Sequence, residues 1–171
     1  MNKTENAQTL GGREIVASLD REFARLFHKS CAVIESTPSE NLYAPAPHET
    51  ATATTSDVPQ PTSIGENVLR AAAAIEQTFG GITANLWDDP FEWTLPEYLA
   101  TPARVLGYLT EVEETRRRAF TSFTDDGCLL KQVAVPSGET PPLIDLLRST
   151  LMRAAAYLGQ ETKCPEHSFR D

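Results

Sequence analysis

Residues 63–87, SIGENVLRAAAAIEQTFGGITANLW, form the stretch of sequence that decides the fold. Ser63 followed three residues later by Glu66 is the pattern of a capping box, in which each side chain satisfies a free backbone N–H group of the first helical turn. Apolar side chains then recur at spacings of three and four, at Ile64, Val68, Ala71, Ala72, Ile75, Phe79, Ile82 and Leu86. The pattern predicts an amphipathic helix over residues 64–86 whose apolar stripe is buried against other helices.

Three other segments repeat apolar side chains with the same helical period. They predict further helices near residues 13–36, 102–124 and 141–159. Four amphipathic helices in 171 residues predict one all-α domain, residues 1–171, built as a four-helix bundle. The bundle core is expected over residues 13–160, and residues 161–171 are expected to form a polar tail.

Proline marks the predicted starts of the last two helices. Thr101 and Thr140 occupy the capping positions, and Pro102 and Pro141 follow at the first helical position, where a backbone N–H group is not needed. Between these helices, CLLKQVAVPSGET, residues 128–140, alternates like a short strand or extended arm and ends in a Pro-Ser-Gly turn.

Two long connections separate the predicted helices. Residues 38–62 are rich in proline and threonine, which excludes a regular element and predicts a loop that is either mobile or laid along the bundle. Residues 86–102, LWDDPFEWTLPEYLATP, read as a structured crossover. Its expected anchors to the bundle are Trp87, Phe91, Trp93 and Leu95.

Gly80 and Gly81 interrupt the second predicted helix at a cost of about 2 kcal/mol in helix propensity. We therefore expect a close approach of another helix or a local bend at this point. In the crossover that follows, the acidic side chains of Asp88, Asp89 and Glu92 match the spacing of no calcium loop, so we expect them to be solvated.

Charge and composition exclude several classes of function. A net charge of −9 opposes binding to nucleic acid and to anionic membranes. The run Arg116, Arg117 and Arg118 is interpreted as a solvated helix face balanced by Glu111, Glu113 and Glu114. No apolar run is long enough to span a membrane, and no signal pattern opens the chain. Three widely spaced cysteines indicate neither disulfides nor a CxxC site, so a cytoplasmic location is expected.

The three histidines do not predict a metal site. His28 lies beside the apolar stripe of the first helix and His48 lies in the loop, while Cys164 and His167 form a lone C-x-x-H pattern in the tail. Because these residues fall on separate elements, no ligand set can be assembled from them.

Four stretches resemble a known family. SIGENVLR, the tryptophan-containing crossover, VPSGETPPLIDLL and RAAAYLGQ together are similar to the DinB-like (YfiT-type) superfamily of bacterial four-helix bundles, over residues 13–160. The resemblance implies an up-down-down-up bundle with a structured crossover between the second and third helices, and a homodimer. Many members bind a divalent metal through three histidines, and some are thiol transferases or resemble hydrolases.

At the family's three metal-ligand positions this chain carries Arg70, Arg153 and Tyr157. Arginine is protonated at any working pH and has no lone pair for a metal, so neither the three-histidine site nor a metal cofactor can be carried over. Two guanidinium groups and a phenol could instead form a pocket for a small anionic ligand. On a helical wheel, however, Arg70 lies about 150° from the centre of its helix's stripe, which favours a surface position paired with Glu66.

Two functions stay open on the sequence. The first is a non-catalytic binding or interaction module that lacks the family's metal site and forms a homodimer. The alternative is a transferase or hydrolase that depends on a metal with unconventional ligands or on Cys31 or Cys128 as nucleophile. Cys31 falls on the apolar face of the first helix, where a free cysteine behaves as a small hydrophobic side chain.

Overall fold

The computed structural model describes residues 12–45, 63–92 and 97–159. These residues form four long helices: α1 (Glu14–Ser36), α2 (Ile64–Ala84), α3 (Pro102–Ser122) and α4 (Leu143–Gly159). Three short 3₁₀ helices accompany them: η1 (Ser39–Asn41), η2 (Pro90–Glu92) and η3 (Asp126–Leu130). Within these residues there is no β-strand, so the predicted all-α class and the four helices are confirmed.

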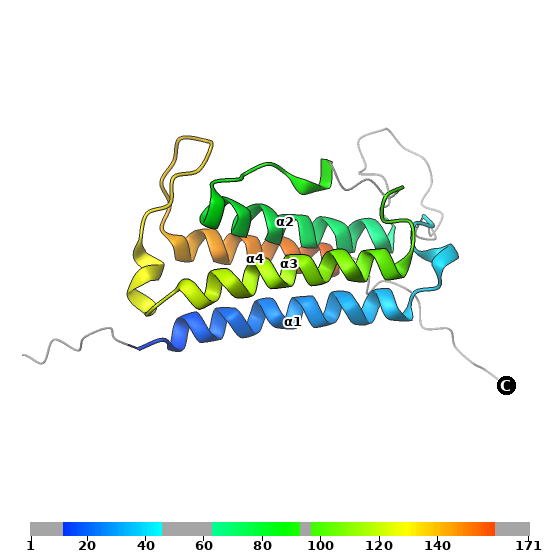
Figure 1. The fold of residues 1–171 in the computed structure, drawn as a ribbon, viewed down its shortest axis with the longest axis horizontal. Helices are drawn as coiled ribbons and strands as arrows, with labels where there is room; N and C mark the ends of the chain where they lie inside the picture. Colours follow the sequence, from blue (N-terminus) through cyan, green and yellow to red (C-terminus); the bar gives the residue numbers. More distant parts are fainter. Residues whose placement is uncertain (1–11, 46–62, 93–96, 160–171) are drawn as a thin grey trace, which may run out of the picture.

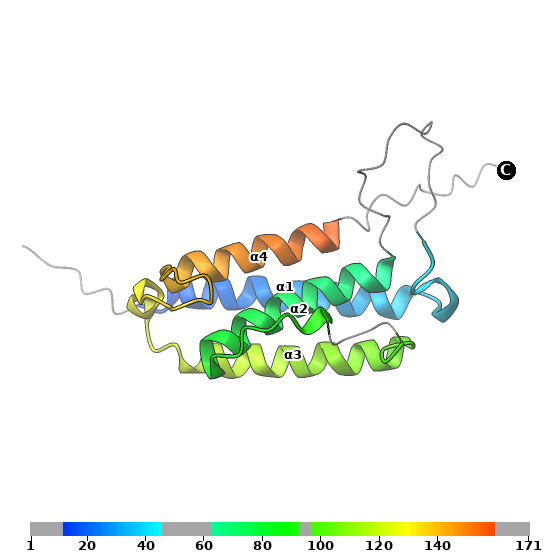
Figure 2. The same cartoon turned by 90° about the horizontal axis from the view of Figure 1, so that it is seen from above.

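The four helices pack side by side along one long axis (Figure 1). α2 and α1 lie on opposite sides of the bundle, and α3 and α4 fill the space between them on the two remaining sides, as the two views show together (Figures 1 and 2). α2 packs most extensively, against both α4 and α3. α1 and α4 run in one direction along the axis, and α2 and α3 run in the other (Figure 1).

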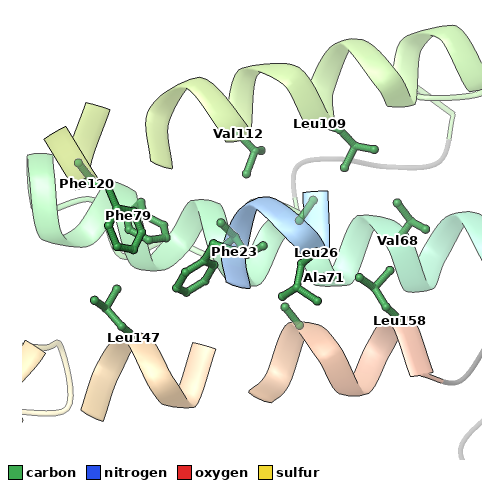
Figure 3. Packing of buried hydrophobic residues seen from close by; sticks show 14 of the residues in the cluster. Phe23, Leu26, Val68, Ala71, Phe79, Leu109, Val112, Phe120, Leu147 and Leu158 are labelled. Carbon is green, nitrogen blue, oxygen red and sulfur yellow. The ribbon is translucent and has the colours of Figure 1, made fainter. Parts of the chain in front are cut away.

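The core is a continuous apolar cluster to which all four helices contribute side chains (Figure 3). Phe23 of α1, Phe79 of α2 and Phe120 of α3 meet toward one end of this cluster, with ring centroids 5.2 to 5.8 Å apart in tilted or edge-to-face arrangements. Such contacts between aromatic rings stabilise a core beyond the apolar area that they bury. Leu147 and Leu158 of α4 close the cluster from the remaining side and are almost inaccessible to solvent.

Local signals place the starts of α2 and α3 as the sequence predicts. The Ser63 hydroxyl accepts the Glu66 backbone N–H, and the Glu66 carboxylate accepts the Ser63 backbone N–H, which completes the capping box. Thr101 caps α3, with Pro102 at the first helical position. The predicted end of α2 is wrong at Leu86, because the helix stops at Ala84 and leaves Leu86 exposed.

The predicted start of α4 is also wrong, since the helix begins at Leu143 rather than Pro141. The Pro141 carbonyl accepts the backbone N–H of Val133, and Pro142 forms an isolated antiparallel bridge with Gln132. The two prolines therefore belong to the returning arm of an extended turn, and Thr140 is exposed beside that turn instead of capping the helix.

Gly81 is explained by a close approach, although the neighbour is the crossover rather than another helix. A Cβ atom at Gly81 would lie 2.3 Å from the indole ring of Trp87. Asn85 ends α2 in the left-handed conformation and turns the chain so that the crossover runs back along the outer side of α2 (Figure 1). Of the other predicted anchors, Phe91 packs against the core, while Trp93 and Leu95 lie outside the described residues.

The interpretation of the basic run as a solvated helix face is wrong for Arg116, which is buried. Its side chain is only 3% exposed and makes a bidentate ion pair with Glu113, at 2.7 Å for each nitrogen to oxygen contact. It also pairs with Asp20 of α1 and so links α1 to α3. Arg117 and Arg118 are exposed, as predicted.

Among the helices described, none is long and apolar enough to cross a membrane.

Candidate functional site

Arg70, Arg153 and Tyr157, the three residues singled out from the sequence, line one small pocket in the structure. α2 contributes Arg70, Ala74 and Gln77, and α4 contributes Arg153 and Tyr157. The crossover contributes Asp89 and Phe91 to the lining. The space open to the centres of water-sized molecules is about 40 Å³, which is the scale of a small polar ligand or a few waters.

Arg70 is the most unusual side chain of the pocket. Its guanidinium carbon lies 4.0 Å from the centre of the Phe91 ring, an arrangement that stabilises a cation over an aromatic face. Its Nε atom is buried and has no hydrogen-bond partner among the described residues. An unpaired buried N–H group costs free energy, and an acceptor that reached this donor would recover that cost. The predicted pairing with Glu66 is wrong, since that carboxylate is used in the capping box.

A chain of hydrogen bonds positions Arg153 on the other side of the pocket. Arg153 Nη2 donates to Gln77 Oε1 at 3.3 Å and, more weakly, to the Ala74 carbonyl at 3.5 Å. Gln77 Nε2 in turn donates to the Trp87 carbonyl at 2.9 Å. The packing of Trp87 on Gly81 thus fixes Gln77, and Gln77 orients the guanidinium of Arg153.

Tyr157 and Asp89 complete the polar lining. Tyr157 is half-buried against the core, and its hydroxyl makes no hydrogen bond within the described part of the chain. Asp89 is exposed, and its Oδ1 accepts the Phe91 backbone N–H at 3.0 Å. The pocket therefore offers two cations, a phenol and an amide at one side, and a single carboxylate on the crossover.

The donor set fits an anion and does not fit the metal that the resembled family holds at these positions. Guanidinium groups provide hydrogen-bond donors in a planar fork that matches carboxylate or phosphate oxygens, and they have no lone pair to coordinate a metal. Two fixed positive charges also repel a divalent cation at short range. Among the described residues, no group of three His, Cys, Asp or Glu side chains could hold a metal ion.

The cysteines named as candidate nucleophiles lie away from the pocket lining. Cys31 is half-buried on α1, and burial raises the pKa of its thiol, with the nearby carboxylates of Glu35 and Glu113 raising it further. Such an environment disfavours the thiolate that nucleophilic catalysis requires. Cys128 is buried in η3. His28 is exposed, whereas His48, Cys164 and His167 lie outside the described residues.

Gln77, Phe91 and Asp89 also line the pocket, although the sequence indicated Phe91 only as an anchor of the crossover, Asp89 only as a solvated carboxylate, and Gln77 not at all. A signal for Gln77 is present, since Arg70, Ala74 and Gln77 follow the spacing of four and three that places side chains on one helical face. Phe91 and Asp89 reach the pocket through the path of the crossover, for which no periodicity exists.

No protein-family model, curated protein or solved structure matches the chain.

Proposed function

We propose that this protein is a non-catalytic binding module that holds a small anion between Arg70 of α2 and Arg153 of α4. One observation carries the proposal: a half-buried arginine whose Nε–H has no partner among the described residues lines the same pocket as a second arginine and a tyrosine. Charge-assisted hydrogen bonds from guanidinium to oxyanions are the strong ones in proteins, and a pocket of this size selects small ligands.

The proposal extends to the fold family and assembly. The directions of the four helices and the crossover over α2 support a DinB-like, up-down-down-up bundle. We also propose a homodimer, which the resemblance supports, and a cytoplasmic location, which the cysteine pattern supports. Light scattering at high protein concentration tests the homodimer, and a strictly monomeric mass would exclude it.

Calorimetric titration with acetate and with inorganic phosphate at low ionic strength tests the anion site. The natural protein should bind one acetate per chain. Replacing Arg70 or Arg153 with methionine should weaken acetate binding about tenfold or more, because each removes a charge-assisted hydrogen-bond donor. Arg148→Met is the matched control, since Arg148 also lies on α4 but its side chain is 71% exposed and outside the pocket. No saturable binding of either ligand at tens of millimolar would exclude the site.

A transferase or hydrolase remains the competing function, and metal content separates its metal-dependent form from the binding module. We expect no stoichiometric transition metal in the natural protein after dialysis against nickel and zinc, with an Arg153→His and Tyr157→His double variant analysed beside it. One metal per chain in the natural protein, lost on changing Arg153 or Tyr157, would favour the enzyme.

A further inference from the structure

The pocket carries a negative charge that a site for a simple anion does not need. Asp89 lines the same hollow as Arg70 and Arg153, but it reaches the pocket from the crossover, whereas the arginines come from α2 and α4. A carboxylate in this position weakens the binding of any purely anionic ligand, since like charges repel across a short distance. A positive group on the ligand would offset this repulsion.

Neither arginine of the pocket forms an ion pair with Asp89 in the described part of the chain. Ion pairs within the described residues involve Arg25, Arg116 and Arg148, and none joins Asp89 to a basic side chain. One oxygen of Asp89, Oδ1, accepts the Phe91 backbone N–H at 3.0 Å, which orients the carboxylate. The second oxygen makes no hydrogen bond in this part of the structure and is free to accept one.

We propose that the ligand is a small zwitterion, an amino acid or a short ω-amino acid, whose carboxylate binds Arg70 and Arg153 and whose ammonium binds Asp89. This inference rests on the anion site proposed above and specifies its ligand class. The donors and the acceptor line one pocket from separate elements, so one small ligand with opposite charges at its two ends can contact both. An ammonium carries three donors and no acceptor, so the free Asp89 oxygen is its natural partner.

The same arrangement selects against phosphate. A phosphate dianion gains from both arginines but is repelled by Asp89, and it offers no cation for that carboxylate. Neutralising Asp89 should therefore change the affinities for the two ligand classes in opposite directions. A purely structural role of Asp89 would instead change both affinities in the same direction.

Calorimetric titrations of the full chain with matched ligands test the inference. The zwitterions are glycine, β-alanine and 4-aminobutyrate, and their controls without the amine are acetate, propionate and butyrate. At least one zwitterion should bind about threefold to fivefold more tightly than its control, which is the scale of one partly exposed ion pair. Three chain lengths are used because the span between the charges is the variable that the ligand must match.

Asp89→Asn removes the charge and keeps an oxygen that accepts the Phe91 N–H. This variant should bind the preferred zwitterion about threefold to fivefold more weakly and inorganic phosphate more tightly. Asp88→Asn is the control, because it makes the same charge change at an exposed neighbour outside the pocket lining. It should change neither the affinity for the zwitterion nor the affinity for phosphate.

The outcomes separate this inference from the proposed function. Equal affinities for zwitterions and their controls, or an equal effect of Asp89→Asn on both classes, would overturn the zwitterion and leave the anion site standing. Absence of binding for acetate, phosphate and all three zwitterions would overturn both.

Discussion

The guanidinium carbon of Arg70 lies over the ring of Phe91, 4.0 Å from the ring centre. The two residues come from different elements, since Arg70 belongs to α2 and Phe91 to the crossover that runs along it. The contact keeps a charged side chain near the core without an acceptor for its Nε–H. Phe91 thereby positions the guanidinium of Arg70, which the proposed anion site requires.

Replacing Phe91 with leucine should weaken acetate binding about twofold to fivefold. Leucine keeps apolar contact with the core but lacks the aromatic face that stabilises the cation by about 0.5–1 kcal/mol. Calorimetric titration measures the change. Leu86→Ala serves as control because Leu86 lies on the same crossover and is 61% exposed. Unchanged acetate affinity in Phe91→Leu would show that Phe91 does not position Arg70.

Replacing Gly81 and replacing Gly107 with alanine should change the free energy of unfolding in opposite directions. Gly81→Ala places a Cβ atom 2.3 Å from the Trp87 ring, and overpacking of about 1–3 kcal/mol should outweigh a gain of about 1 kcal/mol in helix propensity. Gly107→Ala in α3 meets no atom within 4 Å and should stabilise the protein by about 0.5–1 kcal/mol.

Urea unfolding of both glycine variants checks this pair of predictions. Gly81→Ala should also change the tryptophan fluorescence and weaken acetate binding, because displacement of Trp87 releases Gln77 and then Arg153. Two variants that are both stabilised would show that Trp87 does not pack on Gly81.

Arg116→Met should reduce the free energy of unfolding by about 2–3 kcal/mol. The substitution leaves the carboxylate of Glu113, which is only 13% exposed, without its bidentate partner and removes the link to Asp20 on α1. Arg117→Met, on the exposed side of the same helix, should stay within about 0.5 kcal/mol of the natural protein. Denaturant unfolding compares the two, and equal effects would contradict the buried position of Arg116.

The hydroxyl of Tyr43 predicts a pH dependence of stability in alkaline solution. Its Oη donates to the Leu99 carbonyl at 2.7 Å, and burial, with a further contribution from Glu66, raises its pKa to about 12 from an ordinary value of about 10. The folded state therefore holds this proton more tightly than the unfolded chain. The resulting stabilisation is complete below about pH 10 and is lost as the pH rises toward 12.

Urea unfolding of the natural protein and of Tyr43→Phe between pH 9 and about 12 measures this contribution. The natural protein should lose more stability than the variant across that interval. Parallel curves for the two proteins would contradict the raised pKa of Tyr43.

The long helices could be predicted because their signals are local. The apolar period, the Ser63 and Glu66 capping box and the Thr101 and Pro102 start act within a few residues of one another, and α2 and α3 begin where they indicate. The start of α4 could not be predicted in this way. It is set by a hydrogen bond from Val133 to Pro141, which exists only once the extended turn has folded.

The pocket could be predicted only in part. The helical wheel assigned Arg70 to the surface because it assumed one buried stripe on α2, whereas α2 is buried against α3, α4 and the crossover. Ala73 and Ala74, off the predicted stripe, are accordingly buried too. Arg116 was misassigned for a related reason, since its partner Asp20 lies on another helix.

The most direct test of the anion site follows the side-chain Nε–H signal of Arg70 by NMR during titration with sodium acetate. An Arg70→Lys variant assigns the signal, and sodium chloride keeps the ionic strength constant. We expect a saturable shift of this signal as the unpaired N–H group gains an oxygen acceptor, while the Arg117 signal stays in place. An Arg70 signal that does not move, or that moves only in parallel with that of Arg117, would contradict the anion site.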